Sequence, residues 1–154
     1  MISNAGYSHY PITGGTLNAA NLITAGIVLL TVVAIESGGL FLLKVVKGKQ
    51  KANALQTSFF RAGHAHAGVL VILGLVTLLL VDGSGMTGPP VAAPTLVLSA
   101  AILMPAGFFL SVIGDDPKKP NGFALLLYVG AAVLAVGLVL GGVGLIGAGV
   151  AQLP

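Results

Sequence analysis

The chain has 154 residues, of which 56% are hydrophobic and only 7% are charged, and its mean hydropathy is +1.03. About a quarter of the residues in a soluble domain are charged. Lipid must therefore be the solvent for most of this chain. The absence of cysteine excludes disulfides, thiolate metal sites and cysteine nucleophiles. The net charge of +3 rests on only seven Lys and Arg, and their placement indicates membrane topology rather than nucleic-acid binding.

Four apolar runs follow one another, and each has the roughly 20 residues that a spanning helix needs. Their continuous hydrophobicity lacks the period-two alternation of a membrane β-barrel. Because the connections are short, sequential helices should be antiparallel neighbours. The sequence therefore predicts an all-α integral membrane protein: a four-transmembrane-helix antiparallel bundle in one membrane domain, 1–154, which includes an extracytoplasmic tail, 1–16. The predicted helices cover residues 17–43, 62–81, 95–113 and 123–149.

The first predicted helix carries Glu36 within its apolar run, eight residues before Lys44 and so about 12 Å from the interface at 1.5 Å per residue. An ionised carboxylate at that depth costs several kcal/mol unless it finds a partner. Asn18 lies about five turns earlier and shares the face of Glu36. We therefore expect this face to point towards protein rather than lipid.

The second predicted helix begins with Arg61, whose long side chain can reach the headgroups, and continues with His64 and His66. The hairpin to the first helix brings Glu36 into the same half of the membrane. The sequence thus predicts a polar cluster of Glu36, Arg61, His64 and His66, as a candidate cofactor site or proton relay.

The spacing of the two histidines limits what they can bind. Residues two apart on a helix point about 200° apart, so His64 and His66 cannot both bind one ion from a regular helix. The pattern is a poor zinc signature, and which metal the cluster would take stays unknown. Two histidines on opposite faces require two protein neighbours, a shallow position for one of them, or a partner molecule.

The third and fourth predicted helices each contain one packing feature. Pro105 should kink the third helix. Gly137 and Gly141 on the fourth form a small-xxx-small pattern, which lets helix backbones approach closely. This pattern serves either helix packing inside the bundle or an interface with a partner.

The cations give the predicted orientation. All of them fall in or beside the first and third loops, which should therefore be cytoplasmic, with both termini outside and the chain multi-pass in the cell membrane. They are Lys44, Lys47, Lys49, Lys51, Arg61, Lys118 and Lys119.

Three functions fit these features. We favour a non-catalytic accessory or assembly subunit of a membrane complex, partnered by the lipid bilayer and by a homo-oligomer or a larger assembly, with no nucleic acid. The first alternative is a redox protein that binds haem b or a metal through His64 or His66, with a haem shared at a dimer interface because His9 lies on the other membrane side. The second alternative is a proton or cation relay, or small transporter, through Glu36 and a histidine. No nucleophile with its base, phosphate-binding loop or carboxylate pair is visible, so no catalytic residue is predicted.

Overall fold

The computed structural model describes residues 17–154, so the predicted tail, 1–16, and His9 lie outside the described residues. Within residues 17–154 the chain forms four α-helices and no strand, and all four are long and apolar enough to cross a membrane. This confirms the all-helical prediction and the four helices of membrane-spanning length. The helices are α1 (Ala19–Val46), α2 (Ala54–Gly83), α3 (Ala93–Leu110) and α4 (Leu125–Val150), and short 3-10 turns, η1 (Pro89–Ala92) and η2 (Gly122–Ala124), lead into α3 and α4.

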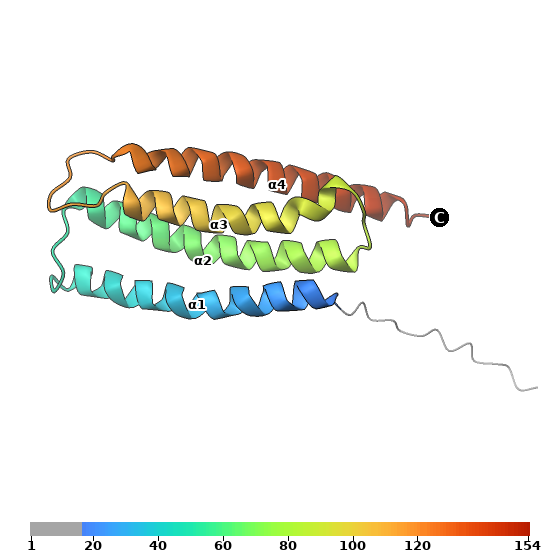
Figure 1. The fold of residues 1–154 in the computed structure, drawn as a ribbon, viewed down its shortest axis with the longest axis horizontal. Helices are drawn as coiled ribbons and strands as arrows, with labels where there is room; N and C mark the ends of the chain where they lie inside the picture. Colours follow the sequence, from blue (N-terminus) through green and yellow to red (C-terminus); the bar gives the residue numbers. More distant parts are fainter. Residues whose placement is uncertain (1–16) are drawn as a thin grey trace, which may run out of the picture.

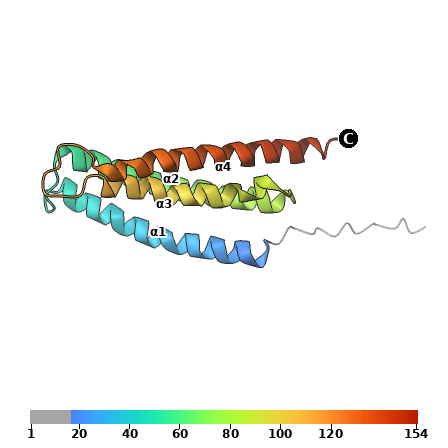
Figure 2. The ribbon, with the colours of Figure 1, turned by 45° about the horizontal axis from the view of Figure 1, so that its top comes forward.

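Consecutive helices run in opposite directions and lie side by side in chain order (Figure 1). Helices α2, α3 and α4 form a close layer, whereas α1 contacts only α2 among the helices and diverges from α3 and α4 (Figure 2). The buried core follows this arrangement: Leu70 and Val71 of α2 meet Ala101 of α3, and Val28 is the one residue of α1 that is buried.

Glycines set the close approach of α3 to α4. A Cβ on Gly107 would lie 2.8 Å from the backbone nitrogen of Leu127, so a larger residue would force the two helices apart. Gly137 and Gly141 are buried at the same contact, where a Cβ on Gly137 would lie 2.9 Å from Leu96 Cβ. The Gly137/Gly141 pattern thus lies at the α3–α4 contact, where small residues let helix backbones approach closely.

Helix α2 begins earlier than the expected residue 62. Asn53 caps it: its side chain accepts a hydrogen bond from the backbone N–H of Gln56, whose side chain in turn accepts one from the N–H of Asn53. This capping box starts the helix at Ala54, in a polar segment that hydropathy alone does not assign to it. Arg61 therefore lies about two turns inside α2 rather than at its start.

Side-chain hydrogen bonds tie the helix ends together. At one end of the bundle, the amides of Asn18 and Asn21 both donate to Oδ1 of Asp82, which joins the start of α1 to the end of α2. At the other end, Gln56 donates to the carbonyl oxygens of Val112 (3.1 Å) and Gly114 (2.9 Å), which fixes the α3–α4 connection on the start of α2.

Helix α3 continues through Pro105, which is buried. It ends at Leu110 rather than at the expected residue 113. The chain then turns, and the left-handed φ of +130° at Gly114 is a conformation that glycine adopts at low cost.

Candidate functional site

Glu36 is exposed on α1, and it makes no hydrogen bond or ion pair with any of residues 17–154. The one ion pair in this range joins Lys118 to Asp116 in the α3–α4 connection and does not involve Glu36. Leu29 and Leu43 lie two turns to either side of Glu36, on the same face, and are 58% and 46% exposed. Glu36 is thus an ionisable group on an otherwise apolar outer face of α1.

His64 lies between α2 and α1. A Cβ on Gly38 would be 3.4 Å from its Nδ1, and a Cβ on Gly39 would be 3.4 Å from its Nε2, so the imidazole lies along the backbone of this Gly-Gly step. The ring is half-buried, and neither nitrogen makes a hydrogen bond within the described chain. His64 therefore keeps a free donor and a free acceptor next to α1.

His66 lies on another face of α2, towards α3. Its ring centroid is 4.9 Å from that of Phe108, and its Nδ1 is 2.8 Å from the carbonyl oxygen of Ala62. Because a carbonyl oxygen only accepts, this geometry assigns the proton of the neutral ring to Nδ1 and leaves Nε2 with a free lone pair. The two histidines thus have two different protein neighbours, as the helical spacing predicts.

Arg61 is exposed and forms no ion pair with Glu36 or with any other residue from 17 to 154. The described part of the chain also contains no group of three His, Asp or Glu side chains that could hold a metal ion. Of the predicted polar cluster, the fold therefore joins His64 to α1 and His66 to α3, while Glu36 and Arg61 face outward.

Phenylalanines that the sequence analysis did not single out surround the histidines. Phe60 of α2 meets Phe41 of α1 at a centroid distance of 5.4 Å and stacks on Phe109 of α3 at 5.8 Å, so one ring links three helices. Phe59 meets Phe108 at 5.7 Å. The signal was present in the sequence as two Phe-Phe pairs, at 59–60 and 108–109, because adjacent residues on a helix can contact two neighbours.

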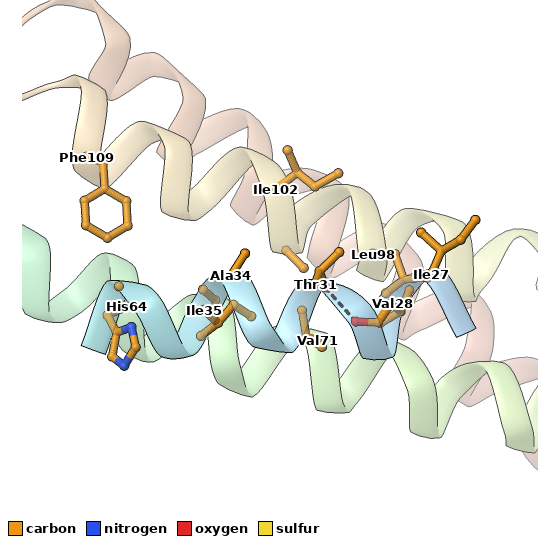
Figure 3. Close-up of a pocket in the computed structure, with 13 residues that line it drawn as sticks. Ile27, Val28, Thr31, Ala34, Ile35, His64, Val71, Leu98, Ile102 and Phe109 are labelled. Atoms are coloured by element: carbon orange, nitrogen blue, oxygen red, sulfur yellow. Dashed lines mark hydrogen bonds between the residues drawn. The ribbon is translucent and has the colours of Figure 1, made fainter. Parts of the chain in front are cut away.

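A groove of about 410 Å³ opens where α1 diverges from α3, with α2 as its floor (Figure 3). His64 and Phe109 lie at one end, and Ile27 and Leu98 lie towards the other. The wall is apolar apart from His64 and Thr31. The hydroxyl of Thr31 already donates to the carbonyl oxygen of Val28 at 2.6 Å, so the imidazole is the polar group left free there.

Four helices of membrane-spanning length and apolarity are typical of a multi-pass membrane protein. Comparison of the chain with models of protein families, with curated proteins and with solved structures gave no match.

Proposed function

We propose that this chain is a non-catalytic subunit of a larger membrane assembly and that the outer face of α1, defined by Leu29, Glu36 and Leu43, is its docking surface. The observation that carries the proposal is the exposed carboxyl of Glu36, which makes no hydrogen bond or ion pair with residues 17–154.

The carboxyl of Glu36 lies deep in the predicted span, and its side chain is short. Glu36 lies about 12 Å along the helix from Lys44, and its short side chain cannot extend to the headgroups as a lysine or arginine can. An ionised carboxylate at that depth costs several kcal/mol, and a neutral carboxyl still lacks acceptors and donors in hydrocarbon. A helix from a partner or a second copy that offers a hydrogen-bond donor removes this cost, because polar side chains bond across helices in membranes.

The orientation of the subunit follows from its cations. All seven belong to the end of the bundle that holds the α1–α2 and α3–α4 connections, whereas the C-terminus lies at the other end (Figure 1). The positive-inside rule favours a cytoplasmic position for the cationic end and external termini in the cell membrane. Cysteine labelling in intact cells tests this: a membrane-impermeant maleimide should modify Gln152→Cys and not Lys49→Cys. The reverse pattern would invert the proposed topology.

The assembly is tested by measuring the mass of the protein purified from its native host in mild detergent, by light scattering or native mass spectrometry. Wild type should carry a second copy or a co-purifying subunit. Glu36→Leu should release it, because leucine offers no hydrogen bond, whereas Glu36→Gln should keep it through its amide. Ser37→Ala, at an exposed neighbouring position on α1, is the matched control and should assemble like wild type. A wild-type monomer whose mass Glu36→Leu leaves unchanged would refute the proposal.

A second function, haem b or metal binding, is favoured by one observation at His66. Metal-bound histidines usually donate their other ring N–H to a carbonyl or carboxylate, as His66 does to Ala62. Oxidised and dithionite-reduced absorption spectra, with elemental analysis of the same sample, test it. A Soret band lost in His66→Ala would establish haem, and stoichiometric metal without that band would establish a metal site. A colourless, metal-free protein would exclude both.

A further inference from the structure

The groove between α1 and α3 combines a free imidazole with an uncharged, apolar wall. No Asp, Glu, Lys or Arg lines it. A polar group in such surroundings is unfavourable until it is hydrogen-bonded. The half-buried ring of His64 makes no hydrogen bond with residues 17–154, so it is open to one from a ligand in the groove.

The shape of the groove limits its occupant. It extends from the level of Gly38 to that of Ile27 on α1, eleven residues or about 16 Å along the helix. A partner helix of that length, about 10 Å across with its side chains, would occupy about 1,200 Å³. The groove offers about 410 Å³, which is too small to enclose a whole helix and lies within the range of small-molecule sites.

The position of His64 fixes the direction in which a ligand lies. His64 is three residues, or about 4.5 Å, deeper than Arg61 along α2. A head at His64 would lie at the level of Gly38 and Gly39, about 8–9 Å along α1 from Lys44, and a tail would run along α1 towards Ile27. The absence of a cation or carboxylate from the wall disfavours a charged head, because an unpaired charge would be desolvated there.

We propose that the groove binds an uncharged, single-tailed amphiphile whose carbonyl or hydroxyl head hydrogen-bonds to His64, the chemistry that a membrane quinone presents. This proposal is independent of the subunit proposal. The α1 residues that line the groove lie between about 80° (Val28) and 180° (Ile27) from Glu36 around the helix, so the ligand and the docking partner would use different sides of α1.

The test measures binding of a decyl-tailed benzoquinone to the full chain in lipid nanodiscs, by equilibrium dialysis and by the ¹⁵N shifts of the histidine rings. Wild type should bind it, and the ring nitrogens of His64 should shift. His64→Leu keeps the apolar wall but removes the hydrogen bond, so its affinity should fall about tenfold, the effect of one good hydrogen bond. His66→Leu is the matched control, since His66 does not line the groove, and its affinity should be unchanged.

Two further comparisons separate the possible occupants. Ala101→Phe fills the groove from α3 and should abolish binding. Ala34→Phe fills it from α1 and replaces the first variant if that one does not fold. Decylbenzene, which has the tail without the carbonyls, should bind wild type and His64→Leu equally. Equal quinone affinity in wild type and His64→Leu, or unchanged binding in both filled variants, would overturn the proposal. So would tighter binding of decanoate than of the quinone, because the site would then select a charged head.

Discussion

The side-chain amide of Asn18, at the start of α1, donates a 2.7 Å hydrogen bond to Oδ1 of Asp82, in the last turn of α2. The amide of Asn21 donates to the same oxygen. Because α1 contacts no helix other than α2, these bonds close the end of the α1–α2 pair that no loop connects.

We therefore expect Asp82→Ala to let the start of α1 move away from α2 and to lower the free energy of unfolding by about 1 kcal/mol, the usual scale for hydrogen bonds between membrane helices. The chain has no cysteine, so spin labels can be attached uniquely through Ala20→Cys and Leu79→Cys. Double electron–electron resonance should give a longer mean distance and a broader distance distribution in Asp82→Ala. Asp82→Asn keeps the acceptor oxygen and should resemble wild type. An unchanged distance in Asp82→Ala would show that packing alone holds α1.

At the opposite end, Asp116 links the α3–α4 connection to α2. The side-chain hydrogen bond from Asn53 (2.8 Å), followed by the hydrogen bond and positive charge of Lys118, holds the pKa of Asp116 below its ordinary value of 3.8. Since the folded state lowers this pKa, the contribution of Asp116 to stability is complete above pH 3.8 and is lost as the pH falls through the folded value. The contact should therefore be intact at neutral pH and weaken only in acid.

The substitution Asn53→Asp separates this contact from helix capping. Aspartate caps a helix as well as asparagine does, so α2 should still begin at Ala54. The new carboxylate cannot donate and repels its neighbour, so the pKa of Asp116 should rise. Carboxyl ¹³C shifts followed through an acid titration measure it, and circular dichroism checks the helix. A pKa of Asp116 that stays at the wild-type value would remove Asn53 as the main cause.

Hydropathy was enough to predict four membrane helices, because length and apolarity are local properties of the chain. It could not predict where α2 begins: the capping box of Asn53 and Gln56 is built from polar residues outside the apolar run. The separation of His64 and His66 onto two faces followed from helical geometry alone.

The environment of Glu36 could not be derived in this way. Helix α1 is apolar on nearly every face, so its periodicity does not indicate which side meets α2. Tertiary packing decides which side of α1 meets α2. Val28 and the Gly38–Gly39 step face α2, Glu36 faces outward, and the groove opens between α1 and α3. The expectation of a partner for Glu36 inside the chain is not met among residues 17–154, and its role stays a prediction.

The last prediction concerns the glycines of α4 and tests whether Gly137 packs against α3 or against a partner. A Cβ on Gly137 would lie 2.9 Å from Leu96 Cβ and 3.3 Å from the carbonyl oxygen of Ala93, so Gly137→Ala forces α3 and α4 apart. Overpacking of this kind costs about 1–3 kcal/mol. Gly142, on the same helix, has no neighbour within 4 Å of such a Cβ. Gly142→Ala should therefore leave stability unchanged or raise it by up to about 1 kcal/mol, because alanine favours the helix.

Unfolding by sodium dodecyl sulfate, followed by circular dichroism, compares the two variants with wild type. If Gly137 serves packing inside the chain, Gly137→Ala loses stability in the isolated protein, with or without any partner present. If the pattern instead served a partner, the isolated Gly137→Ala protein would unfold like wild type and lose only its oligomeric mass. The two measurements, stability and mass, thus assign the glycine face of α4 independently of the test made at Glu36 on α1.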